Sequence, residues 1–265
     1  MCLITLSWQP DAKLRLIVAA NRDEFYARPA MPAHHWPEAG IVSGKDLQAG
    51  GTWLGLGLGM PQTKGRGAVR LAALTNYRGL TSVKPTAPSR GDITSAFLRG
   101  SMSAAAYLQS LSESANLYNP FNLILFDGHE LLGFESRHRR AFALPLGISA
   151  VSNADFNTPW PKLVRLRRDF AQALERAPDH AQLETDLFNA LACDAVAADA
   201  ELPQTGLPLL RERALSAAFI RTADYGTRAC SVLQIGDTQA SFSERSFGAS
   251  GFLGMVTERL SWGHL

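Results

Sequence analysis

The sequence predicts an α+β protein built from antiparallel sheets with helices on their outer faces. Three observations support this class. Segments with the two-residue alternation of strands lie at both ends of the chain and in its middle. Helical periodicity is confined to two regions, residues 92–114 and 159–193, so strands and helices do not alternate as they would in a parallel sheet. With 265 residues and no visible internal repeat, we expect a single domain spanning residues 1–265.

The first hairpin is the best defined element of the sequence. Apolar and polar residues alternate over 2–8 and again over 14–20, and Pro10-Asp11 supplies the turn between them. The second strand runs into the polar block Asn21-Arg22-Asp23-Glu24. A polar block at the end of a strand indicates a candidate site.

Cys2 lies at the outer tip of this hairpin. If Met1 is removed, Cys2 carries an α-amine with a pKa of roughly 7.7–8.0, which can accept the thiol proton directly or through a water. Nucleophile and base would then belong to one residue. The alternative is that Met1 is retained and Cys2 is a small apolar residue of the strand.

The next segments connect this hairpin to a second group of strands. Residues 28–51 are rich in Pro and Gly and predict an extended loop, in which His34 and His35 are adjacent and point apart. The glycine alternation over 50–58 opens a strand, which predicts close backbone approach to a strand or ligand and not a phosphate loop. A polar loop, Pro61–Gly67, precedes a strand over 68–75 that ends at Asn76.

The middle of the chain combines two helices, a hairpin and further strands. Helices are expected over 92–99 and 103–114, with Ser103 as N-cap. The turn dipeptide Asp127-Gly128 predicts a hairpin. The run Arg137-His138-Arg139-Arg140 is either a solvated turn or a clamp for an anion. Strands over 141–144 and 147–152 then lead to Asn153.

Helices and one more hairpin complete the chain. Amphipathic helices are expected over 159–176 and 179–193, followed by an irregular segment over 201–213. Strands over 225–235 and 239–247 form the last hairpin, which contains Arg228.

Composition argues against several classes of function. The formal charge of +2, with 46% hydrophobic and 19% charged residues, is that of an ordinary globular protein and gives no reason to expect nucleic-acid binding. No apolar run approaches about 18 residues and no signal peptide is visible, so we expect no membrane span and a cytoplasmic location. Cys2, Cys193 and Cys230 are far apart, which predicts neither disulfides nor a metal site.

Several short motifs together resemble the NRDE-motif family, also called the transport-and-Golgi-organisation protein 2 family. They occur in order as Met1-Cys2, Asn21–Phe25, Gly50–Gly55, Thr75-Asn76, Ser89-Arg90-Gly91, Tyr118–Asn122, Ser152-Asn153, Pro159–Lys162 and Tyr225–Arg228. The resemblance implies an N-terminal-nucleophile hydrolase-like fold, a four-layer αββα sandwich. More remotely, Cys2, residues 76–80, Asn153 and Arg228 are similar to positions around the cysteine of choloylglycine and penicillin V acylases.

The residue types fit a cysteine amidohydrolase acting on a small amide or acyl substrate without a cofactor. Arg22 or Arg228 would stabilise the Cys2 thiolate, and Asp23 or Glu24 would orient the amine. The amides of Asn76 and Asn153 would bind the oxyanion. Alternatively, these are structural ion pairs and turn-forming asparagines. Because neighbouring strand residues face opposite sides, Arg22 and Asp23 both reach Cys2 only if the backbone turns there.

The family resemblance also implies a second class of function, a non-catalytic carrier that binds and traffics haem. Cys2, His34 or His35 would be the axial ligand, and Arg228 would pair with the propionates. The expected partner is therefore a small molecule or haem, and the sequence leaves the oligomeric state open.

Overall fold

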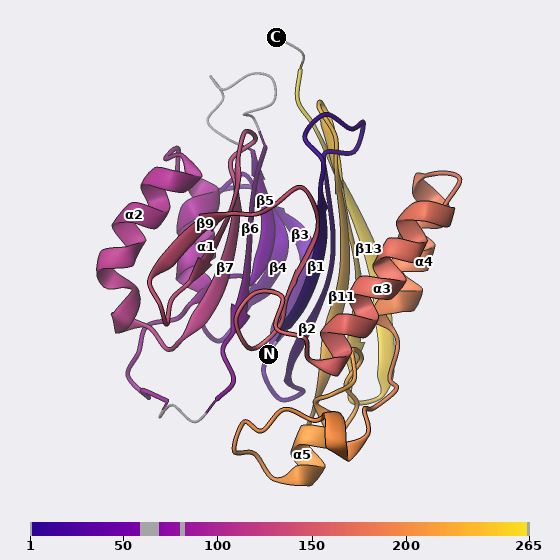
Figure 1. Ribbon diagram of the computed structural model, residues 1–265. Coiled ribbons are helices and arrows are strands. Elements are labelled where there is room, and N and C mark those ends of the chain that lie inside the picture. Colours follow the sequence, from indigo (N-terminus) through magenta and orange to yellow (C-terminus); the bar gives the residue numbers. More distant parts are fainter. Residues whose placement is uncertain (1, 59–68, 80–82, 264–265) are drawn as a thin grey trace.

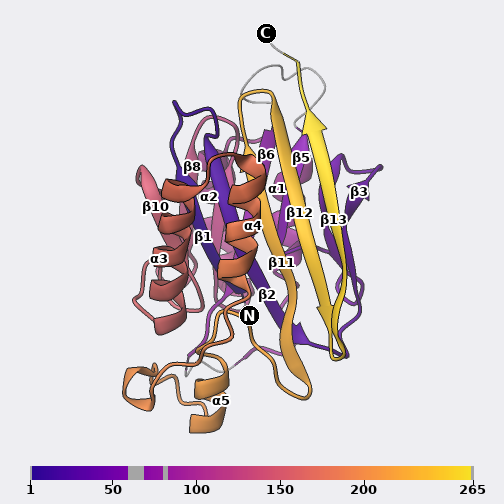
Figure 2. The same ribbon diagram turned by 90° about the vertical axis from the view of Figure 1, so that its right-hand side faces the viewer.

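Two antiparallel sheets stacked face to face form the centre of the molecule (Figures 1 and 2). The structure is a computed structural model that describes residues 2–58, 69–79 and 83–263. Helices cover the outer face of each sheet, so the layers run helix, sheet, sheet, helix. The predicted α+β sandwich of antiparallel sheets is confirmed. The predicted loop at Pro61–Gly67 lies outside the described residues.

The first sheet has six strands, in the order β10-β1-β2-β11-β12-β13. They are β1 (Cys2–Trp8), β2 (Leu16–Phe25), β10 (Gly147–Val151), β11 (Tyr225–Ile235), β12 (Gln239–Gly248) and β13 (Gly251–Ser261). The predicted first hairpin is confirmed, with Cα pairs from Cys2 opposite Arg22 to Trp8 opposite Leu16. β2 continues through the polar block to Phe25, beyond its predicted end. The edge strand β13 was not predicted.

The second sheet has seven strands in sequence order. They are β3 (Ala30–Trp36), β4 (Ile41–Asp46), β5 (Leu54–Leu58), β6 (Val69–Asn76), β7 (Phe121–Phe126), β8 (Leu131–Glu135) and β9 (Arg140–Ala143). The prediction of a loop over 28–51 is therefore wrong, because β3 and β4 lie within it. β3 tolerates Pro32 because it is an edge strand whose pairing register shifts between Met31 and His34.

The helices divide between the two outer faces. α1 (Gly91–Arg99) and α2 (Ala104–Ser114) cover the seven-stranded sheet, while α3 (Pro161–Arg176) and α4 (His180–Leu191) cover the six-stranded one. Ser103 caps α2 as predicted, since its side chain accepts a hydrogen bond from the Ala106 N–H. The segment predicted as irregular contains the short helix α5 (Leu209–Ala214). In the described residues, 3₁₀ turns occur at 115–117 and 199–201.

Alternation along the first hairpin decides which side of the sheet each residue faces. Ile4 and Leu6 of β1 lie in the core between the two sheets, whereas Leu3 lies in the core beneath α3 and α4. By the same alternation, Cys2 and its cross-strand partner Arg22 face the second sheet. Asp23 follows Arg22 and faces the helices. Arg22 and Asp23 therefore face opposite sides of the sheet, as the alternation along the strand predicts.

The alternating glycines of β5 allow helix α1 to approach closely. A Cβ atom placed on Gly57 would lie 2.6 Å from the Leu98 carbonyl oxygen in α1. We expect Gly57→Ala to lower the free energy of unfolding by about 1–3 kcal/mol, because the backbone must shift to relieve this overlap. Urea unfolding measures the loss. Gly254→Ala in β13 is the control, since a Cβ there meets nothing within 4 Å; equal losses in both variants would contradict the explanation.

Candidate functional site

A cavity of about 630 Å³ lies at the Cys2 end of the sandwich and is lined by strands of both sheets. Cys2 and Asn76 are part of its wall. So are six cationic side chains and four acidic ones: Arg22, Arg28, Lys45, Lys84, Arg90, Arg228, Asp23, Glu24, Asp46 and Glu244. Apolar side chains such as Trp53 and Met255 complete the lining. This combination suits a small molecule with both apolar and charged parts.

Cys2 is buried in the cavity wall, with 5% of its surface exposed. Burial raises the pKa of its thiol to about 11, and the carboxylates of Asp23 and Glu24 act in the same direction, while Arg22 lowers the pKa. The thiol is therefore protonated at neutral pH. A nearby base is needed before this sulfur can act as a nucleophile.

This raised pKa predicts an unusual pH dependence for alkylation of Cys2 in the chain that retains Met1. Because only the thiolate reacts, the rate with iodoacetamide should rise about tenfold per pH unit from about pH 7 to about pH 10. An ordinary thiol levels off above its pKa of about 8.5. Peptide mapping by mass spectrometry measures the rate at Cys2. A plateau near pH 9 would contradict the raised pKa.

Arg22 is held beside Cys2 by a carboxylate from the other sheet. Its Nη2 lies 3.2 Å from Asp46 Oδ2, and Arg28 Nε lies 2.6 Å from the same oxygen. Burial opposes ionisation of Asp46, but the hydrogen bond from Arg28 and the neighbouring charges lower its pKa overall. Glu24 joins this group, 4.0 Å from Arg22. The guanidinium beside the thiol is thus positioned by an ionised partner.

Asp23 is buried on the helix side of the same strand. Its Oδ1 accepts a hydrogen bond of 2.7 Å from Thr227 Oγ1. Burial raises the pKa of Asp23, while the charges of Lys162 and Arg22 lower it. Asp23 lies one residue beyond the Cys2–Arg22 pair, on the side of the Cys2 amide nitrogen. That nitrogen would become the α-amine if Met1 were removed.

The two predicted asparagines are in contact with each other. Asn153 is fully buried, and its Nδ2 donates to the Asn76 carbonyl oxygen at 2.9 Å. The side-chain amide of Asn76 makes no hydrogen bond within the described residues, and Asn76 lines the cavity, whereas Asn153 does not. Within the described part of the chain, the amide of Asn76 therefore keeps its donor unused in the cavity wall, and Asn153 supports the Asn76 backbone.

Lys162, in the first turn of α3, was not predicted as a site residue. It is buried, and its Nζ donates to Asn153 Oδ1 at 3.3 Å. Burial lowers the pKa of Lys162 to about 8, and Asp23 acts in the opposite direction. The motif Pro159-Trp160-Pro161-Lys162 was visible in the sequence as part of the family resemblance. Only the fold shows that its lysine contacts Asn153 and lies near enough to Asp23 for the two charges to interact.

Arg228 lines the cavity, but its guanidinium is bound to backbone carbonyls. It donates at 3.0–3.1 Å to four carbonyl oxygens, those of Phe25, Tyr26, Arg28 and Phe247. The pairing of β11 with β2 shifts register between Thr227 and Ala229, which makes Arg228 the extra residue of a bulge. In this position Arg228 anchors the turn that carries Arg28 to the cavity.

The two histidines lie apart from the cavity, on edge strand β3. His35 is exposed, and His34 is partly buried with its Nδ1 2.8 Å from the Pro32 carbonyl oxygen. Neither lines the cavity that contains Cys2.

Arg90 is a second residue that the sequence did not single out. It precedes the first turn of α1, lines the cavity and donates from Nη1 to the Pro120 carbonyl oxygen at 3.2 Å. Burial lowers its pKa, while Cys2 and Glu24 act to raise it. The signal was the motif Ser89-Arg90-Gly91, whose arginine the fold brings into the wall that contains Cys2.

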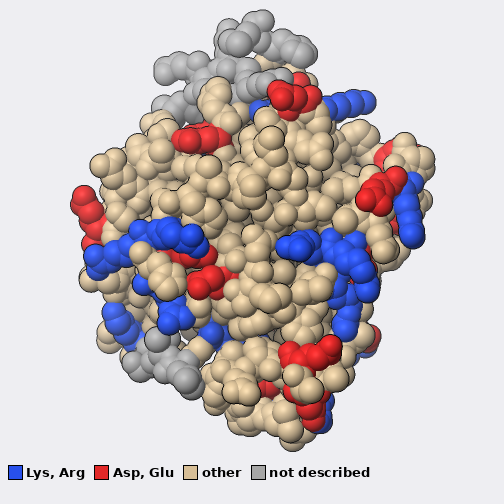
Figure 3. Space-filling view, viewed as in Figure 1, with Lys and Arg blue, Asp and Glu red and all other residues tan. Residues whose placement is uncertain are grey.

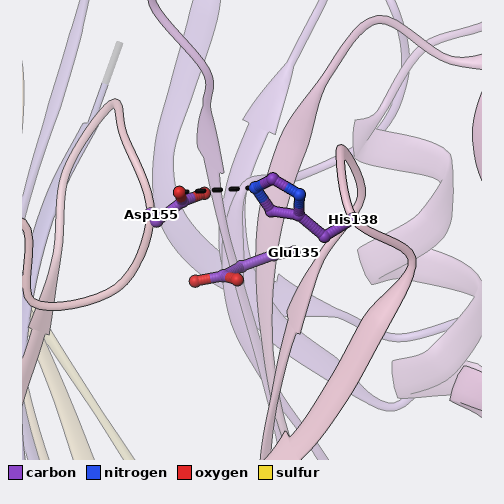
Figure 4. A group of neighbouring side chains, drawn as sticks. All are labelled: Glu135, His138 and Asp155. Carbon is purple, nitrogen blue, oxygen red and sulfur yellow. Dashed lines mark ion pairs between the residues drawn. The ribbon is translucent and has the colours of Figure 1, made fainter.

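A separate polar cluster is formed by Glu135, His138 and Asp155 (Figure 4). His138 Nε2 lies 3.4 Å from Asp155 Oδ2. These atoms are of the type that bind metals, but Glu135 Oε2 already accepts bonds of 3.0 and 2.6 Å from Arg140. Glu135 Oε1 accepts a bond from the Phe156 N–H. The cluster therefore has the contacts of an ion-pair network at a turn.

On the visible face of the molecule (Figure 3), the surface charges form small groups of both signs. On the face shown in Figure 3, basic side chains gather in separate patches with acidic side chains beside them. Among the described residues, no helix is long and apolar enough to cross a membrane.

Fold and cavity together define the class: an α+β sandwich with Cys2 in the wall of a charged cavity between two sheets. The chain belongs to the Transport and Golgi organisation 2 family, whose sequence model matches residues 1–249. This confirms the resemblance seen in the sequence motifs.

Animal relatives match along most of the chain. The Transport and Golgi organization protein 2 homolog of Bos taurus is 35% identical over 272 residues, which cover 93% of each chain. The Mus musculus homolog is 34% identical over the same shares. The Drosophila melanogaster Transport and Golgi organization protein 2 is 28% identical over 190 residues, covering 64% of this chain and 62% of the fly protein.

Proposed function

We propose that this protein is a cysteine amidohydrolase that acts on a small amide or acyl substrate, with Cys2 as nucleophile after removal of Met1. One observation carries the proposal. Cys2 faces a cavity of about 630 Å³ together with Arg22, while Asp23 follows Arg22 on the side of the Cys2 nitrogen that would become the α-amine. Nucleophile, thiolate-stabilising cation and amine-orienting carboxylate then come from one hairpin.

The reaction follows from these positions. The Cys2 amine takes the Sγ proton, and the thiolate attacks the substrate carbonyl carbon, while the Asn76 amide donates to the oxyanion. When the C–N bond breaks, the ammonium returns its proton to the leaving nitrogen and a thioester remains. Water, deprotonated by the same amine, then attacks the thioester, which releases the acid and restores the thiol. Asn153 and Lys162 act by positioning Asn76.

Mass spectrometry of the intact protein tests the proposal. The native protein should lack Met1, and incubation with p-nitrophenyl acetate should attach one acetyl group that maps to Cys2. Retention of Met1 in the active preparation, or acylation that never involves Cys2, would show that the hydrolase proposal is wrong.

Haem binding is a second candidate, because a thiol and several arginines line the same cavity. The sulfur would supply an axial ligand and the arginines would pair with propionates. Ferric haem added to the protein should then give a shifted Soret band that Cys2→Ala weakens. A His34→Ala, His35→Ala double variant should keep the shift, since both side chains lie outside the cavity lining. A spectrum equal to that of free haem would eliminate this candidate.

A further inference from the structure

Most of the cationic groups that line the cavity are already bound to protein groups. Arg22 and Arg28 share the Asp46 carboxylate, and Arg228 donates to four backbone carbonyls. Lys84 donates to the Asn116 carbonyl oxygen at 2.7 Å. Each of these cationic groups therefore already has a partner in the wall of the cavity.

Arg90 differs from these residues. Its one hydrogen bond within the described residues is the Nη1 contact with Pro120, and it has no carboxylate partner there. Arg90 is only partly buried, and it lines the cavity. Lys45 has no carboxylate partner in the described part of the chain either, but its Nζ lies 4.8 Å from the centre of the Trp36 ring. Among the described arginines of the lining, Arg90 is thus the one that combines a single hydrogen bond with the absence of a carboxylate partner, so its charge is the least compensated.

We propose that Arg90 binds a carboxylate group of the ligand, so that the cavity selects small anionic molecules. A guanidinium suits this task because two of its N–H groups can bond one carboxylate in parallel. A singly charged group fits better than a dianion such as phosphate, because Glu24 and Glu244 also line the cavity. The substrate class, an amide or acyl compound with a carboxylate near the reacting carbonyl, rests on the proposed function. The carboxylate site itself does not.

A pair of alkylating reagents tests the site directly. Iodoacetate and iodoacetamide both form an Sγ–carbon bond with the Cys2 thiolate and release iodide, but only iodoacetate carries a carboxylate. Both rates are proportional to the fraction of Cys2 that is ionised. Their ratio is therefore independent of that fraction, and a change in the pKa of Cys2 does not affect it. We expect Arg90→Gln to lower the iodoacetate-to-iodoacetamide ratio at Cys2 about tenfold, because a charge-assisted contact is lost. Arg90→Lys should retain part of the preference.

Arg99→Gln is the matched control, because it removes an exposed arginine from the other end of α1. It should leave the ratio unchanged. An equal ratio in the native and Arg90→Gln proteins would overturn the carboxylate site, as would a Cys2 that neither reagent labels. Failure of the hydrolase proposal has a different signature: Met1 is retained and no acyl adduct forms on Cys2, while the alkylation ratio still depends on Arg90.

Discussion

Cys2→Ser should lower the Cys2-dependent hydrolysis of p-nitrophenyl acetate by roughly a thousandfold or more, measured as release of p-nitrophenolate. Losses of this size are typical when a nucleophile is removed. Serine preserves the shape of the side chain, but its hydroxyl is a much weaker nucleophile than a thiolate at neutral pH. The urea midpoint should barely change, because Cys2 packs as a small residue of β1.

Cys193→Ser is the control for this effect. Cys193 is a partly exposed thiol that follows α4 and does not line the cavity. Its loss should leave the hydrolysis rate unchanged. If the Cys193 variant lost as much activity as the Cys2 variant, the reactive thiol would have to be sought outside the cavity.

Arg15→Met should lower the free energy of unfolding by about 2–4 kcal/mol, because the buried carbonyls of Gly128 and Gly236 lose their donor, at a cost of about 1–3 kcal/mol each. Arg15 is 2% exposed and joins turns from both sheets. It donates to the Gly128 carbonyl oxygen at 2.9 Å and to that of Gly236 at 3.2 Å, and its Nε lies 3.1 Å from Asp237 Oδ1. Methionine fills the space but leaves these acceptors without their donor. Urea unfolding at neutral pH measures the effect.

Arg213→Met is the comparison for Arg15. Arg213 makes a bidentate ion pair with Asp199, and the two side chains are 39% and 50% exposed. Water can replace an exposed ion pair at little cost, so the urea midpoint should not move. A similar loss in both variants would mean that burial does not explain the contribution of Arg15.

Strands, turns and caps of this protein could be predicted from its sequence where the local residue pattern is sufficient to specify them. The hairpin of β1 and β2, the β7–β8 hairpin at Asp127-Gly128 and the cap at Ser103 depend on interactions between residues close in sequence. The β3–β4 pair could not be predicted, because its Pro, Gly and His residues have low strand preference. That pair is stabilised by its place at the edge of a sheet that β5 and β6 extend.

The candidate site also has one part that the sequence predicted and one part that only the tertiary structure revealed. Alternation along β2 determined that Arg22 shares the face of Cys2 while Asp23 takes the other, since side chains of a strand point alternately to its two faces. Only the tertiary structure placed Arg90 and Lys162 around the cysteine and bound Arg228 to carbonyls. Arg90, Lys162 and Arg228 lie dozens to hundreds of positions from Cys2 in the sequence, and the stacking of two sheets, which no local pattern encodes, brings them to the same end of the molecule.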